Sequence, residues 1–167
     1  DRVATLTDML DLPAPQWVNS THAAIPVVAE TELQAVSHED ALRPYSLAVG
    51  AYPTHTEYAL AHNRTWYHSH VAVDATTDDD RAYYAVGMLN RLGIESKSIG
   101  RVFLYGPGAT GSPSTYRSVF DRSPTIFDLR DVVAVQPEKR SNDDLSADLA
   151  PEFVPCVGAT LLGESSG

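Results

Sequence analysis

Residues 65–74 read Thr-Trp-Tyr-His-Ser-His-Val-Ala-Val-Asp, and this stretch, with the segment that follows it, decides the fold. Aromatic and β-branched residues are frequent in it, which predicts a strand over residues 65–73. Successive side chains point to opposite faces of a strand. The alternation therefore predicts that one face carries Trp66, His68, His70 and Ala72.

The next segment predicts the principal helix of the domain, over residues 77–92. Thr76 or Thr77 can cap its N-terminus, and the three aspartates at 78–80 fall in the first turn, where the helix dipole favours negative charge. Gly93 is typical of a helix C-terminus. The predicted buried stripe consists of Ala82, Ala85, Val86, Leu89 and Leu92.

Further strands are predicted around these two elements. Their ranges are 45–50, 100–105, 131–135 (within a longer apolar run from Ile126) and 157–162. The spacing of Thr54 and Glu57 matches a capping box and predicts a helix from 54 to 62, and a helical turn is expected near 116–120. The sum is an α+β fold, with a mixed, mainly antiparallel sheet and the helix 77–92 packed on one face.

The chain of 167 residues suits a single domain with three regions. We expect a short helix and arm over residues 1–24, an α+β core over 25–135, and an acidic loop with a C-terminal strand or arm over 136–167. Because long arms in a small domain are usually held by something else, they indicate contact with a neighbouring chain. The chain starts at Asp1 rather than methionine, which we interpret as a processed product or a segment of a longer polypeptide.

Composition limits the classes of partner. The chain has 12 basic and 22 acidic side chains, a net charge of −10, so binding of nucleic acid through a broad basic face is not expected. A single cysteine, Cys156, excludes an internal disulfide and a multi-cysteine zinc site. No run approaches the roughly 18 apolar residues of a membrane span, so a membrane partner is not expected either.

The two histidines of the strand offer the sharpest chemical hypothesis. On one face, His68 and His70 can ligate one zinc ion, and a carboxylate from Asp78 or Asp80 can supply a third ligand, leaving a position for water. The alternative is that both imidazoles are hydrogen-bonded residues of a half-buried sheet face.

Trp66-Tyr67-His68-Ser69-His70 resembles the Trp-Tyr-His-Ser-His core of the JAMM metalloisopeptidase motif. The resemblance implies a zinc-dependent hydrolase. Val71 stands where that family has proline, and residues 77–80 are displaced by one position from the family spacing. The glutamate that acts as general base in that family has no counterpart at the required spacing.

A glycine-rich loop over residues 106–111 follows the strand 100–105 and resembles a Walker A loop. Ser112 stands where a lysine must reach the phosphates, and Pro113 where a hydroxyl must hold magnesium. Phosphate binding therefore has no mechanism, and the loop is interpreted as a turn or a surface contact.

Since no catalytic motif is complete, the leading hypothesis is a non-enzymatic structural or assembly subunit without a cofactor, such as a virus coat protein or a segment of one. Aromatic side chains would pack between subunits, with Trp17, Trp66 and Tyr116 as the candidate interface residues. The location would then be the virion, and otherwise the cytoplasm. The alternative from another class is the zinc-dependent hydrolase, with His68, His70, Asp78 and Asp80 as metal ligands.

Overall fold

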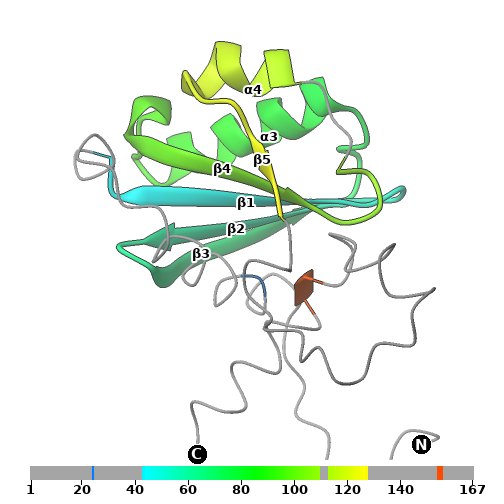
Figure 1. The fold of residues 1–167 in the computed structure, drawn as a ribbon, viewed down its shortest axis with the longest axis horizontal. Coiled ribbons are helices and arrows are strands. Elements are labelled where there is room, and N and C mark those ends of the chain that lie inside the picture. The colour runs from blue at the N-terminus through cyan, green and yellow to red at the C-terminus, as the bar shows by residue number, and fades with distance from the viewer. Residues whose placement is uncertain (1–23, 25–42, 110–112, 128–153, 156–167) are drawn as a thin grey trace, which may run out of the picture.

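A five-stranded sheet with the strand order β3-β2-β1-β4-β5 organises the molecule (Figure 1). The computed structural model describes residues 24, 43–109, 113–127 and 154–155. The strands are β1 (Tyr45–Ala51), β2 (Thr56–His62), β3 (Thr65–Ala72), β4 (Ile99–Tyr105) and β5 (Thr125–Ile126). The pairs β1–β2 and β2–β3 are antiparallel, whereas β1–β4 and β4–β5 are parallel. This mixed sheet with its helices confirms the predicted α+β class.

Strand β2 replaces the helix predicted over residues 54–62. Its residues are buried from Thr56 to Ala61. Tyr58 and Leu60 pack into one core cluster, whereas Ala59 and Ala61 pack into another. The Glu57 carboxylate does not cap a helix but accepts a hydrogen bond from Tyr105. The helix prediction was wrong because burial on both faces of a central strand outweighs a local capping pattern.

Helix α3 (Asp78–Arg91) agrees with the helix predicted over 77–92. Its N-terminus is a complete capping box, in which Thr77 Oγ1 accepts from the Asp80 amide at 3.2 Å and the Asp80 carboxylate accepts from the Thr77 amide at 3.3 Å. At the other end the amide of Ile94 bonds to the Leu89 carbonyl at 3.0 Å, and Gly93 has φ of +70°. The predicted start and stop signals therefore act as expected.

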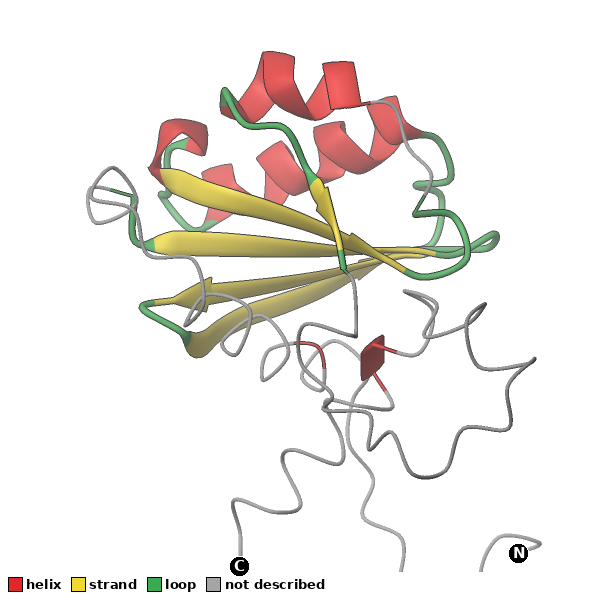
Figure 2. Cartoon of the chain, in the orientation of Figure 1, coloured by secondary structure: helices red, strands yellow, loops and turns green. Residues whose placement is uncertain are grey.

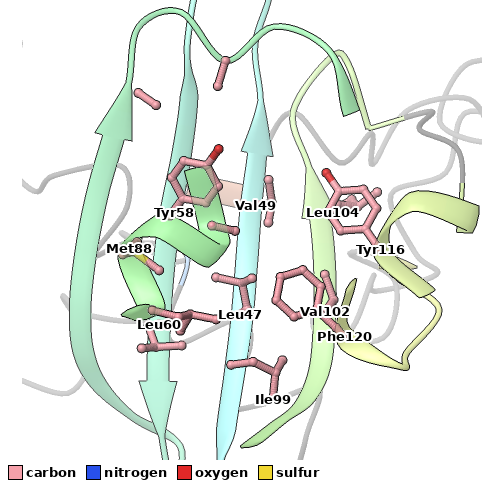
Figure 3. Close-up of a cluster of buried hydrophobic side chains, with 14 of the residues drawn as sticks. Leu47, Val49, Tyr58, Leu60, Met88, Ile99, Val102, Leu104, Tyr116 and Phe120 are labelled. Atoms are coloured by element: carbon pink, nitrogen blue, oxygen red, sulfur yellow. The ribbon is translucent and has the colours of Figure 1, made fainter. Parts of the chain in front are cut away.

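Helix α3 and a second described helix, Pro113–Phe120, lie on the same side of the sheet (Figure 2). Helix α3 and the short 3-10 helix η2 (Ser96–Ser98) connect β3 to β4, and α4 (Pro113–Phe120) connects β4 to β5. We call the covered side the helix face. Its core, shown in part in Figure 3, includes Leu47, Val49, Tyr58, Leu60, Met88, Leu89, Ile99, Val102, Leu104, Tyr116 and Phe120. No described helix is long and apolar enough to cross a membrane.

The opposite side, which we call the far face, has a second and smaller core. Small side chains dominate it beside β1 and β2, and the rings of Phe103 and Phe127 stack with centroids 4.7 Å apart. Ala24 and Val154, which are both fully buried, also belong to this cluster. Residues distant in the sequence thus contribute to the far face.

Several predicted features fall outside the described residues. They are the arms over 1–24 and 136–167, except Ala24 and residues 154–155, and the strands over 131–135 and 157–162.

Candidate functional site

A β-bulge in β3 alters the face assignment that the sequence predicted. Ala61 pairs with Trp66, whereas the adjacent Leu60 pairs with His68, so Tyr67 is an extra residue. Directly opposed residues on antiparallel strands lie on the same face. Trp66 therefore lies on the far face beside Ala61. The prediction that Trp66 and His68 share one face was wrong.

The two histidines do share the helix face, as predicted. His68 is opposite Leu60 and His70 is opposite Tyr58, whose ring stacks with the His70 imidazole at 6.2 Å between centroids. Partial burial lowers the pKa of His70 below 6.5, and the charges of Arg91 and His68 lower it further. The Arg91 guanidinium thus acts on the histidine pair and opposes protonation of His70.

The two aspartates proposed as zinc ligands are engaged elsewhere. The Asp80 carboxylate accepts from the amide and the hydroxyl of Thr77, and Asp78 Oδ1 accepts from Arg81 Nη1 at 3.1 Å. Within the described part of the chain, no three His, Cys, Asp or Glu side chains are grouped so that they could hold a metal ion. The described residues therefore provide no third metal ligand beside His68 and His70.

Strand β3 is an edge strand of the sheet, and its apolar side chains are unusually exposed. We use the term β3 edge for residues 66–73. Trp66, Tyr67 and Val71 retain 45%, 43% and 44% of their accessible surface, and Val73, which directly follows the strand, retains 70%. Val71 is opposite Glu57 and therefore lies on the far face with Trp66. The Tyr67 ring packs instead against Tyr45, at 5.6 Å between centroids.

A second polar region lies where β1 and β4 end. The two strands are parallel neighbours, but the chain continues from β1 to β2 on one side and from β4 through α4 to β5 on the other. Their carboxyl ends therefore form a topological switch point. The loop after β4 packs closely here, because the Gly108 amide donates to the Ala51 carbonyl at 2.9 Å. A Cβ on Gly106 would lie 2.8 Å from the same oxygen.

Arg81 is the buried cation of this region, with 7% of its surface exposed. Its Nε donates to Thr56 Oγ1 at 3.3 Å and its Nη1 donates to Asp78 Oδ1 at 3.1 Å. The Tyr58 hydroxyl donates to the Arg81 backbone carbonyl at 3.0 Å. The guanidinium thus ties the start of α3 to the start of β2.

The far side of the same region contains a buried carboxylate. Tyr105 Oη donates to Glu57 Oε2 at 3.0 Å, and His55 Nε2 lies 3.5 Å from Glu57 Oε1. Burial and the nearby Glu57 carboxylate raise the pKa of Tyr105 well above 10.0. The His55 ring stacks on Tyr52 at 4.8 Å. Sequence reasoning missed this cluster, although a glutamate in an apolar segment was a signal for it.

The predicted interface residues have three different positions. Trp66 is half-exposed on the far face, Tyr116 is fully buried in the helix-face core, and Trp17 lies outside the described residues. The Tyr116 ring packs near Phe120, with centroids 6.5 Å apart, and Figure 3 shows both rings above the sheet. Tyr116 is therefore a core residue in this structure.

No protein-family model and no curated protein matches the sequence. Two solved structures have a similar fold. A chain of the PilM-PilN type IV pilus biogenesis complex matches 96% of this chain with a TM-score of 0.54 and 16% identity. A Bacteroides thetaiotaomicron protein, described as having an actin-like ATPase fold and unknown function, matches 80% of this chain with a TM-score of 0.50 and 9% identity. This chain spans 57% and 51% of those two chains. At such identities the similarity concerns the fold.

Proposed function

We propose that this domain is a non-enzymatic assembly subunit that binds another protein through the β3 edge. The observation that carries the proposal is the exposure of Trp66 and Val71 on the same face of an edge strand. Edge strands present unpaired backbone N–H and C=O groups, and apolar side chains beside them favour pairing with another chain. Such a surface is typical of an interface rather than of a solvated strand.

The fold comparison supports this proposal by analogy. One similar chain comes from a solved complex of pilus biogenesis proteins, which places that protein in a multi-protein assembly. A closed shell, such as a virus coat, is a more specific form of the same proposal. Electron microscopy of particles isolated from the source cells tests it, with discrete closed particles that contain this chain as the expected result.

The switch point between β1 and β4 is less suited to phosphate binding. Among the described residues there, the buried cation is Arg81, and its guanidinium is already bonded to Asp78 and Thr56. The other charged side chain buried in this region is Glu57, which would repel a phosphate. These contacts favour a structural role for this end of the sheet.

The zinc-dependent hydrolase is the second candidate, and the shared face of His68 and His70 is the observation in its favour. Metal analysis of the purified chain, beside a His68→Ala/His70→Ala variant, tests it. Stoichiometric zinc that is lost in the variant would establish a metal site, and its absence from both would remove this candidate.

Site-specific photo-crosslinking in the source cells tests the assembly proposal directly. A photoreactive amino acid at position 67 or 71 is expected to give a discrete protein adduct. The matched control places it at Ile126, which is 47% exposed on β5 at the opposite edge of the sheet. Equal adducts at both edges, or none at 67 and 71, would contradict the proposal.

A further inference from the structure

We infer that the β3 edge binds one extended, acidic segment of another protein, which adds a strand to the sheet beside residues 68–72. This inference rests on the proposed function and names the structure and charge of the partner. Strand addition supplies affinity through main-chain hydrogen bonds and specificity through alternate side chains. Both components can be assigned to particular residues here.

The bulge determines which part of β3 is available. From His68 to Ala72 the pairing with β2 is regular, whereas Tyr67 interrupts it. A bulge bends the strand and disturbs pairing at a sheet edge. The regular segment 68–72 is therefore the part that can receive a partner strand, and no described strand pairs with its outer side.

On the far face, residues 68–72 and the adjacent Trp66 favour a partner strand with apolar side chains. Ser69 lies between Trp66 and Val71 on that face, since it is opposite Ala59. The neighbouring alanines of β1 and β2 are already buried in the far-face core, so the exposed apolar surface is that of Trp66 and Val71. A partner strand with a β-branched residue at alternate positions would cover the exposed parts of Trp66 and Val71.

On the helix face, the side chains of the β3 edge favour a partner strand with negatively charged side chains. His68 and His70 lie there side by side, and Arg91 of α3 is close enough to His70 to lower its pKa. In the described part of the chain, no acidic side chain forms an ion pair with any of these three residues. An imidazole N–H donates to a carboxylate in either protonation state of the ring, and the guanidinium adds a fixed positive charge.

The same side chains argue against a second copy of this chain as the occupant. A twofold antiparallel pairing of β3 with itself would bring both copies of Arg91 onto the same face, where the two guanidinium groups repel each other. Residues 65–72 contain no aspartate or glutamate, so a second copy of β3 would bring no carboxylate to meet them. A partner strand that carries carboxylates on this face removes the conflict.

The test uses the full chain, labelled with nitrogen-15, and synthetic peptides of eight residues. In the first peptide valine alternates with glutamate, and in the second valine alternates with lysine. We expect the glutamate peptide to shift the amide resonances of residues 68–72 and to bind about tenfold more tightly than the lysine peptide at low ionic strength. The Arg91→Gln variant should lose most of this preference, the His68→Ala/His70→Ala variant should weaken binding of the glutamate peptide, and Ile126→Thr on the opposite edge should retain both.

Other results would overturn the inference in distinguishable ways. Equal binding of the two peptides would remove the charge selection. Concentration-dependent shifts of the 68–72 resonances without peptide would identify a second copy as the occupant. If neither peptide binds while crosslinks from positions 67 and 71 persist, the inference fails and the proposed function stands. If the crosslinks are also absent, both fail.

Discussion

Gly50 lies directly against the ring of Tyr105, so closely that a Cβ on Gly50 would be 2.5 Å from Tyr105 Cζ. The two residues are partners in the parallel pairing of β1 and β4. The ring has no room to move, because it is fully buried and its hydroxyl is bonded to Glu57. Only glycine therefore allows β1 and β4 to pair in this register.

The substitution Gly50→Ala is expected to destabilise the domain by about 1–3 kcal/mol, the usual effect of overpacking. Urea unfolding followed by circular dichroism measures this. Gly87→Ala is the matched control, since a Cβ there meets nothing within 4 Å and Gly87 lies inside α3. The control should gain about 0.5–1 kcal/mol from the better helix propensity of alanine. Equal unfolding free energies for Gly50→Ala and Gly87→Ala would contradict the close contact between Gly50 and the Tyr105 ring.

Removing the Tyr105 hydroxyl should also be costly. In Tyr105→Phe the Glu57 carboxylate keeps its burial but loses a donor at 3.0 Å, so we expect a loss of about 1–3 kcal/mol. A double-mutant cycle with Glu57→Gln isolates the interaction, and unfolding free energies of the four proteins measure it. Strictly additive effects of the two substitutions would show that the hydroxyl and the carboxylate are not coupled.

Arg81 and Arg91 belong to the same helix and should respond very differently to substitution. Arg81→Met leaves Asp78 without its buried partner, and we expect a loss of about 3 kcal/mol. Arg91→Gln, at an exposed position, should change the unfolding free energy by less than about 0.5 kcal/mol. Thermal unfolding of both variants is the measurement, and similar losses at the two sites would be inconsistent with the network around Arg81.

His70 makes stability depend on pH in a definite direction. Its folded-state pKa lies below 6.5, chiefly because of burial and also because of Arg91 and His68, so the unfolded chain takes up the proton first as pH falls. The stabilising effect of the neutral folded ring is thus complete above the unfolded pKa and is lost as pH falls through about 6.5 towards the folded pKa. His70→Gln should lose less stability than the natural chain between about pH 7.5 and 5.

An NMR titration of His70 checks the cause of this shift. In Arg91→Gln the His70 pKa should rise, because one of the charges that opposes protonation is removed. An unchanged pKa in that variant would leave burial and His68 as the explanation.

Helices and strands that are determined by neighbouring residues could be predicted from the sequence. Helix α3 was predictable because Thr77, the first-turn aspartates and Gly93 all act within a few residues. Strands β1, β3 and β4 were predictable from β-branched and apolar runs. The shared face of His68 and His70 followed from simple alternation.

The remainder depended on contacts between distant segments. No residue near Tyr67 in the sequence indicates a bulge. The bulge exists because Leu60 pairs with His68 while Ala61 pairs with Trp66 on the opposite strand of the hairpin. Likewise, the role of Glu57 required β4 to bring Tyr105 next to it. Arg81 was overlooked because charged residues are seldom buried, although it directly precedes the apolar stripe of α3.

The topology has a consequence for the order of folding. The hairpins β1–β2 and β2–β3 close through short turns, one of them at Asn63 and Arg64, which both have positive φ. The parallel pairing of β1 with β4 closes a much longer segment, which contains β2, β3 and α3. Contacts with small separation along the chain form faster than those that close long loops. The β1–β3 meander is therefore the natural nucleus, and until β4 docks, the nascent chain exposes β1 as a second open strand that other molecules can capture.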